Sequence, residues 1–396
     1  MNSFNLKSRP VKAIAGVLLV SVALTGCQST KNLFGGKTKD ANAPVELVAL
    51  TPTVNAVKMW SANVGKGEGN IGARQGVSTD GTHVYAASMT GGVRALDAAT
   101  GRVLWTHNTT SKLSSGPGVG DGVVVVGGLN GEVIALDATT GTQKWIQRVS
   151  NEVIAAPAVG QGLALVRSND GRVTAFDLNS GERRWFAAHD MPALTVRGND
   201  SVTMGPGVAF VGNDDGTMTA LVLSSGQSVF DMPIGEMSGR SDLDRLADVD
   251  GAPVLDGSTL YATSFRNSTI AMDGPSGRML WQAEHGGVGR AAVSPTIVAV
   301  ADRKGTVWGL DKSSGAASWK NESLKNRRLY SPVVHGDYIA VGDYDGYIHW
   351  LRQDDGALAG RARAGKAAIK GNPVVSGDVL YVQDTDGTVS AFRLGQ

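Results

Sequence analysis

Short runs of alternating or clustered apolar residues recur along the chain from residue 82 onward. Examples are VVVVGG (123–128), LALVRS (163–168) and DYIAVG (337–342), and each is followed by an Asn-Gly or Asp-Gly pair and then by a second such run. Runs of this length and composition favour strands, and the glycine pairs favour the tight turns of hairpins. No stretch competes with them as an amphipathic helix, so the pattern predicts an all-β protein.

One unit of sequence is repeated through this part of the chain. The clearest copies are GGVRALDAATGRVLW (91–105), GEVIALDATTGTQKW (131–145), GRVTAFDLNSGERRW (171–185) and GTVWGLDKSSGAASW (305–319), and weaker copies begin at residues 216, 267, 346 and 387. The central Asp, or its substitutes Val222, Arg352 and Arg393, recurs at intervals of 40, 40, 45, 51, 38, 41 and 41 residues. A further strand near pairs such as Pro295-Thr296 and Pro373-Val374 brings each unit to four strands. Such units form either a solenoid or a closed propeller.

The two ends of the chain favour the closed ring. The last copy ends at Gln396 without its Trp strand, whereas the strand around Trp60 has no unit of its own before it. We therefore predict an eight-bladed β-propeller of four-stranded blades over residues 45–396. The N-terminal strand is expected to close it by pairing with the C-terminal blade.

A tryptophan ends most copies of the repeat. Phe230 and Gly360 replace it in two copies, and the six that hold the position are Trp60, Trp105, Trp145, Trp185, Trp281 and Trp319. Recurrence around a ring predicts packing between blades, because a Trp buries a large area. Trp308 and Trp350 stand elsewhere in the repeat and are expected in the core. The Asp and Thr/Ser-Gly before the Trp predict a turn in which the carboxylate accepts backbone N–H groups.

The first 26 residues have the pattern of a secretory signal. Three basic residues and no acid precede the apolar run 13–24, which is shorter than the ~20 residues of a membrane-spanning helix. The run ends in Leu24-Thr25-Gly26-Cys27, which resembles the lipobox of bacterial lipoproteins. The resemblance implies cleavage before Cys27, its lipidation and, with Gln28 in place of Asp, an anchor at the periplasmic face of the outer membrane. Residues 27–44 are expected to be the lipidated terminus and a flexible tether.

Charge and composition argue against several classes of function. The 37 basic and 36 acidic residues nearly cancel and form no basic stripe, which argues against nucleic-acid binding. The six histidines are dispersed, without the spacing of metal ligands. Residues 67–72 match GxGxxG by letter, but no helix pattern follows to present amides to a pyrophosphate. We therefore expect no metal, no cofactor and no catalytic residues.

The repeat A-L-D-x-x-T-G-x-x-x-W is similar to that of quinoprotein propellers, which bind pyrroloquinoline quinone. The resemblance implies a shared scaffold, and it leaves open a quinoprotein-like enzyme or a small-ligand sensor that uses the central channel. Those enzymes are generally longer and carry a cysteine pair and calcium ligands, whereas Cys27 is the only cysteine of this chain. A binder of cell-wall polysaccharide is a third alternative.

Nearly the whole chain resembles the BamB family, the lipoproteins of outer-membrane β-barrel assembly. Two stretches that interrupt the repeat, ALTVRG (193–198) and DRLADVD (244–250), carry the resemblance most specifically. The resemblance implies a scaffold that binds the POTRA domains of a BamA-type subunit and assists the folding and insertion of outer-membrane proteins. It assigns the contact to Leu194, Val196, Arg197, Asp248 and Asp250, with Val196 in place of the family's more usual leucine.

The spacing of the repeats points to the same two stretches. The connections that follow Trp185 and Phe230 are swollen, and connections of one kind emerge on one face of a propeller. We therefore expect one patch there, with an apolar centre and charged flanks, as transient interfaces prefer. Nascent outer-membrane proteins are a second expected partner, through strand addition to blade edges, although such edges are short and protected in propellers.

Overall fold

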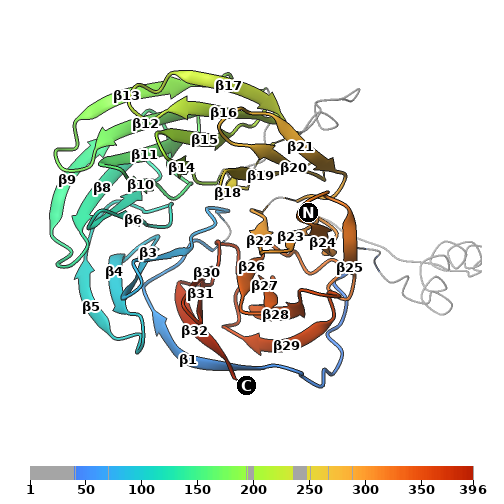
Figure 1. The fold of residues 1–396 in the computed structure, drawn as a ribbon. Coiled ribbons are helices and arrows are strands. Elements are labelled where there is room, and N and C mark those ends of the chain that lie inside the picture. The colour runs from blue at the N-terminus through green and yellow to red at the C-terminus, as the bar shows by residue number, and fades with distance from the viewer. Residues whose placement is uncertain are drawn as a thin grey trace, which may run out of the picture. The chain divides into compact units, whose positions relative to one another are not determined.

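Residues 44–396 fold into a ring of eight four-stranded antiparallel sheets, as the computed structural model in Figure 1 shows. The structure describes residues 40, 42–69, 71–192, 194, 200–234, 248–249, 251–265, 267–287 and 289–395. All regular elements among these residues are strands. The chain divides into Met1–Ala43 and Pro44–Gln396. In the first unit, the expected signal peptide and Cys27 lie outside the described residues.

The two inner strands of each blade face or approach the central channel. The innermost strands are β2 (Val77–Thr79), β6 (Gly118–Gly120), β10 (Ala158–Gly160), β14 (Thr203–Gly205), β18 (Val254–Asp256), β22 (Ala292–Val293), β26 (Val333–His335) and β30 (Val374–Ser376). The second strands are buried along most of their length, and they are β3 (His83–Ser88), β7 (Val123–Gly127), β11 (Leu163–Ser168), β15 (Val208–Gly212), β19 (Thr259–Ser264), β23 (Ile297–Ala301), β27 (Tyr338–Gly342) and β31 (Val379–Gln383).

The third strands are also buried, and the fourth form the outer rim. The third strands are β4 (Gly92–Asp97), β8 (Glu132–Asp137), β12 (Arg172–Asp177), β16 (Thr217–Val222), β20 (Ser268–Asp273), β24 (Val307–Asp311), β28 (Tyr347–Arg352) and β32 (Thr388–Gly395). The outer strands are β5 (Val103–His107), β9 (Gln143–Arg148), β13 (Arg183–Ala188), β17 (Ser228–Pro233), β21 (Met279–Ala283), β25 (Ala317–Asn321), β29 (Leu358–Arg363) and β1 (Asn55–Asn63).

The N-terminal strand closes the ring. Strand β1 pairs antiparallel with β32, from Asn55 opposite Gly395 to Asn63 opposite Thr388, and so completes the sheet that begins with β30. Figure 1 shows β1 along the outer edge of the C-terminal blade. The predicted fold class, number of blades and mode of closure are confirmed.

The repeated tryptophan joins neighbouring blades, as predicted. Trp145 on β9 donates its indole N–H to the carbonyl of Leu178 in the next blade, at 2.9 Å, and its ring covers the turn glycine Gly181. Gly181 has a φ of 75°, and an added Cβ would lie 2.7 Å from the indole, so both the turn and the contact require glycine. The same bond to the following blade is made by Trp60, Trp105, Trp185, Trp281 and Trp319.

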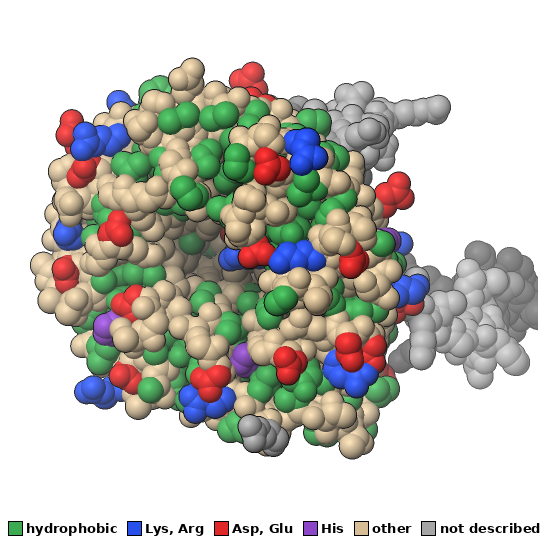
Figure 2. Space-filling model, in the orientation of Figure 1, with side chains coloured by type: hydrophobic (Ala, Val, Ile, Leu, Met, Phe, Trp, Pro, Cys, Tyr) green, Lys and Arg blue, Asp and Glu red, His purple; other side chains and the backbone are tan. Residues whose placement is uncertain are grey.

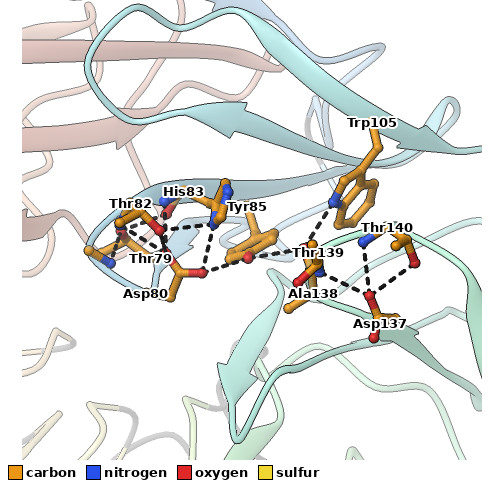
Figure 3. A network of polar contacts seen from close by, with 11 residues as sticks. Thr79, Asp80, Thr82, His83, Tyr85, Trp105, Asp137, Ala138, Thr139 and Thr140 are labelled. Carbon is orange, nitrogen blue, oxygen red and sulfur yellow. Dashed lines mark hydrogen bonds and ion pairs between the residues drawn. The ribbon is translucent and has the colours of Figure 1, made fainter.

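The turn ahead of each Trp has the predicted chemistry. In Figure 3, Asp137 Oδ1 accepts hydrogen bonds from the backbone N–H and the hydroxyl of Thr140, both at 2.9 Å. These bonds favour the charged carboxylate and lower the pKa of Asp137. Trp105 of the preceding blade donates to the carbonyl of Ala138 at 2.9 Å. The repeat motif therefore builds a turn and, through it, an inter-blade contact.

Two blades have no Trp at the repeat position, because Phe230 and Gly360 replace it. Gly360 lies on β29, and its partner across the sheet is Trp350, which is fully buried. In the blade of Trp145 the Trp is on the outer strand and the small residue on the third strand, whereas here the Trp is on the third strand and Gly360 on the outer strand. The prediction of a core position for Trp350 is confirmed.

Trp308 is only half-buried and stacks on His285, with ring centroids 3.8 Å apart. The strand expected near Pro295-Thr296 is β22, which ends at Val293, and the pair itself lies between β22 and β23.

Candidate partner-binding face

The connections from the outer strand of one blade to the inner strand of the next share one face of the ring. They lie beside the turns between second and third strands: Val149, after β9, donates its backbone N–H to the carbonyl of Gly131 at 2.9 Å. We call this face the docking face. It carries the two connections singled out in the sequence, residues 189–202 between β13 and β14 and residues 234–253 between β17 and β18.

These two connections touch each other near their inner ends. The carboxylate of Asp200 accepts the backbone N–H of Ala252 at 3.1 Å, and the hydroxyl of Thr203 donates to the carbonyl of Pro253. The prediction that the two swollen connections form adjacent parts of one face is therefore confirmed for their described residues.

The five residues expected to contact the partner are distributed unevenly over the described structure. The side chain of Leu194 is 45% exposed, whereas Asp248 is fully buried. The other three, Val196, Arg197 and Asp250, lie outside the described residues. The described part of the patch thus has one exposed apolar side chain and one buried acid.

The connection 234–253 is fixed at its described ends to the turn between β15 and β16, in the blade from which the connection starts. Ile234 donates its backbone N–H to Gly216 at 2.8 Å, and Val249 donates to Asn213 at 3.0 Å. Ile234 and Val249 are 2% exposed and belong to the core between β16 and β20. The carbonyl of Asp248 accepts the N–H of Phe265 at 2.8 Å. These contacts anchor the described ends of the connection.

The connection 189–202 is held across the channel. Asn372, on the blade opposite in the ring, donates its side-chain amide to both carboxylate oxygens of Asp200, at 3.0 Å each. Ser201 adds its backbone N–H at 2.7 Å. The carboxylate therefore fixes the inner end of the connection that carries Leu194.

The outer end of this connection is held by a hydrogen-bonded pair of His and Asp side chains. His189 Nε2 lies 2.8 Å from Asp215 Oδ2. Burial opposes ionisation of Asp215, but hydrogen bonds from His189 and Thr217 prevail and lower its pKa. A second pair, between Arg167 and Asp214 at 3.0 Å, is almost fully buried between the same two blades. Both ends of the connection thus rest on fixed charges.

The N-terminal segment reaches the ring at the same face. The backbone N–H of Val45 donates to the carbonyl of Lys325, in the connection between β25 and β26, at 3.1 Å, and Arg327 donates back to the carbonyl of Val45 at 3.0 Å. Arg327 is itself held by Asp343, at 2.7 Å, so its guanidinium is fixed from within the ring.

The same buried acid positions a second arginine. His349 Nε2 donates to Asp343 at 2.9 Å, and His349 Nδ1 accepts from Arg361 Nε at 3.3 Å. Arg361 then donates to the carbonyl of Val48 at 3.0 Å. Burial lowers the pKa of His349 and so favours the neutral imidazole that this arrangement requires. Two arginines therefore fasten residues 45–48 to the ring.

Sequence reasoning did not identify Asp200, Asn372, Arg327 or Asp343. Asp200 and Asn372 are separated by 172 positions, and neither belongs to the repeat motif. The Asn372-Pro373 pair, directly before the inner strand β30, was one feature of the sequence that could have drawn attention to Asn372.

The described residues hold no group of three or more His, Cys, Asp or Glu side chains placed to bind a metal ion. Within the same part of the chain, no helix is long and apolar enough to cross a membrane.

Comparison with known proteins identifies the family. A family model described as outer membrane protein assembly factor BamB matches residues 89–321 and 323–394. The chain belongs to the BamB family. It is 53% identical over 340 residues to the BamB of Xanthomonas campestris, with 83% of this chain and 84% of that protein covered. It is 44% identical to the BamB of Pseudomonas aeruginosa, with 81% and 82% covered.

Solved structures agree with this membership. The crystal structure of BamB from Moraxella catarrhalis has a TM-score of 0.78 to this chain and 28% identity, and it covers 86% of this chain and 100% of its own. A quinohemoprotein alcohol dehydrogenase from Comamonas testosteroni has a TM-score of 0.66 at 16% identity, with 85% and 76% covered, which shows a shared fold alone. BamB is a non-enzymatic assembly factor, so the prediction of an assembly protein over a quinoprotein enzyme is confirmed.

Proposed function

We propose that this BamB-family ring is a periplasmic scaffold of outer-membrane β-barrel assembly that binds the POTRA domains of a BamA-type subunit through its docking face. One observation carries the proposal: the two long connections lie together on one face and are anchored at their described ends, with Leu194 exposed. Apolar anchors with charged flanks are typical of transient interfaces.

Within this proposal the five residues have different tasks. Leu194 and Val196 supply the apolar contact, and Arg197 and Asp250 supply the charges that set recognition and the rate of association. Asp248, which is fully buried, holds the connection 234–253 in place instead of touching the partner. Its backbone bond to Phe265 supports that task.

The lipid anchor completes the proposal. Cys27 is proposed to carry the lipid, and residues 28–44 to tether the ring to the outer membrane, which confines its search for the partner to the membrane surface. Val45, which directly follows the proposed tether in the sequence, lies at the docking face. Replacement of Cys27 by Ser should release the protein into the periplasmic extract on cell fractionation, and persistence in the membrane fraction would contradict the anchor.

Nascent outer-membrane proteins are proposed as a second partner, at the rim of the ring. The outer strands carry exposed apolar side chains on consecutive blades, and these are Val103, Leu104, Ile146, Phe186, Val229, Met279 and Leu280. Their free edges suit the addition of an amphipathic strand. The edge of β29 differs, because Thr53 and Val54 donate to the carbonyl of Ala359 and cover it.

Co-purification from detergent-solubilised membranes tests the main proposal. Arg197→Ala should reduce recovery of the BamA-type subunit, because the variant removes a charge from the docking face. Arg278→Ala is the matched control, since it removes an exposed arginine from a turn on the opposite face. Both variants should keep the thermal unfolding midpoint of the parent. Equal recovery with all three proteins would contradict the assigned face.

A further inference from the structure

The central channel has a recess at its mouth on the docking face. Figure 2 shows the ring with a hollow at its centre. The recess has a volume of about 190 Å³, and the connections of seven blades contribute to its lining. Its charged and polar lining includes Arg74, Asp200, Arg290, Tyr330, Lys370 and Asn372. None of these residues is part of the Trp or Asp positions of the repeat.

Positive charge predominates in this lining. Arg74, Arg290 and Lys370 come from three different blades and are half-buried. Lys370 Nζ lies 3.7 Å from Glu68 Oε1, and the charge of Arg74 also acts on this carboxyl group. With Asp200, three positive groups face two negative ones in a recess where solvent screens charges less than at an open surface.

One of these basic groups is set in place by the fold. Arg74 has a φ of 54°, a left-handed conformation that costs energy for a residue with a side chain, and its guanidinium lies 5.9 Å from the ring centre of Tyr330. The pKa of Tyr330 is raised, mainly by burial. Strain held at a charged recess is characteristic of binding sites.

The mouth already accommodates one carboxylate, that of Asp200. Its oxygens accept hydrogen bonds from the side chain of Asn372 and from the backbone of Ser201 and Ala252. The hydroxyl of Ser331 donates to Asn372 Oδ1, which turns the amide N–H group of Asn372 toward the carboxylate. These donors thus already hold one anionic oxygen group at the mouth, and the basic side chains of the lining remain as the groups that a second anion would meet.

Beyond the mouth most side chains that line the channel wall are apolar, and polar backbone groups are exposed between them. A second cavity of about 380 Å³ lies along the inner strands β18, β22, β26 and β30, and its lining includes Val293, Val333, Val375 and Pro332. Arg290 and Val374 line both cavities, so the basic mouth opens directly onto the apolar wall. A ligand that fits both parts has a charged end and an apolar body.

We propose that the channel binds an organic anion with an apolar body, whose carboxylate or phosphate lies at the mouth near Arg290 and whose body lies against the valines of the inner strands. This site shares the connection 189–202 with the docking surface but does not include Leu194, and it goes beyond the proposed docking function. Asp200 competes electrostatically with such a ligand, since its own charge is at the mouth.

Isothermal titration with four small probes tests this site. The protein is the mature chain with Cys27→Ser, so that no detergent is needed. Octanoate and octyl phosphate carry both a charge and an apolar body, whereas octanol lacks the charge and acetate lacks the body. We expect one or both of the first two to bind, and the last two to bind at least about tenfold more weakly. Tighter binding of octyl phosphate would assign the site to phosphate esters, and tighter binding of octanoate to carboxylates.

Three variants separate the site from a general effect on the ring. Arg290→Gln should weaken binding of the preferred probe by about tenfold, and Asp200→Asn should strengthen it, because the first removes an attractive charge and the second a repulsive one. Arg278→Gln, on the opposite face, should leave the affinity unchanged. Thermal unfolding checks that each variant is folded. Absence of binding by every probe at millimolar concentration, or equal affinity in Arg290→Gln and the parent, would overturn the proposal.

Discussion

Each repeated tryptophan performs two tasks at once, and the size of its cross-strand partner follows from them. The indole donates to the next blade and also covers the turn glycine there, as Trp145 does with Leu178 and Gly181. Across its own sheet the residue opposite is Ala or Gly, for example Ala135 opposite Trp145. Where Phe230 stands instead, an apolar cavity of about 370 Å³ lies beside it, lined also by Leu255 and Pro275.

The indole hydrogen bond should contribute measurably to stability. Trp145→Phe removes the donor and leaves the carbonyl of Leu178 buried without it, which should lower the free energy of unfolding by about 1–3 kcal/mol. Urea unfolding followed by circular dichroism measures the loss. An unchanged midpoint would show that the ring area, and not the hydrogen bond, stabilises this contact.

Two buried histidines predict how stability depends on pH. Burial lowers the pKa of His335 and of His349 in the folded ring. His335 Nδ1 accepts the indole N–H of Trp350 at 3.1 Å, a bond that protonation would break. In the unfolded chain a histidine has a pKa of about 6.5, so below that pH the unfolded state binds more protons. This contribution to stability is complete above about pH 6.5 and is lost as the pH falls toward the lower pKa values of the folded state.

Urea unfolding at a series of pH values between 8 and 5 tests this expectation. The free energy of unfolding should be nearly constant at the alkaline end and should fall on the acid side of about pH 6.5. The pKa of the turn aspartates, such as Asp137 and Asp311, is also lowered, but their effect belongs below about pH 4. Equal stability at pH 8 and pH 5 would contradict the assigned neutral state of the histidines.

At the scale of the elements, the length of the connections between blades located the candidate docking face better than the types of residue in them did. Counting residues between repeats located the two long connections, because a propeller places equivalent connections on one face. Connection length could not predict the contacts that hold these connections. Asp200 contacts Asn372 only because the ring brings opposite blades together across its channel. The burial of Asp248 depends likewise on packing and not on its neighbours in sequence.

The contact between Asp200 and Asn372 should order the docking connection. Asp200→Ala removes the acceptor of these bonds and should weaken co-purification of the BamA-type subunit, because the connection must then be ordered on binding. The ring should retain its unfolding midpoint to within a few degrees. Asp378→Ala, which removes an exposed acid on another turn, is the control. Full recovery of the subunit with Asp200→Ala would show that the connection needs no such support.

At the scale of the whole molecule, most of the ring follows from the sequence. The period of about 40 residues gave the blades, and the unpaired Trp60 strand gave their closure, which the pairing of β1 with β32 confirms. The repeat could not predict the features that occur in only one blade or one connection. The exchange between Trp350 and Gly360, the arginines that hold residues 45–48 and the basic channel mouth all depend on contacts between segments distant in the chain.

Site-specific photo-cross-linking in intact cells tests the docking face most directly. A photoreactive amino acid replaces Leu194 in one variant and Leu280 in the other; the two leucines are 45% and 43% exposed, and Leu280 lies on the outer strand β21. We predict a covalent adduct with the BamA-type subunit from position 194 and none from position 280. An adduct from position 280 with none from position 194 would contradict the proposal that this ring binds its partner through the two long connections.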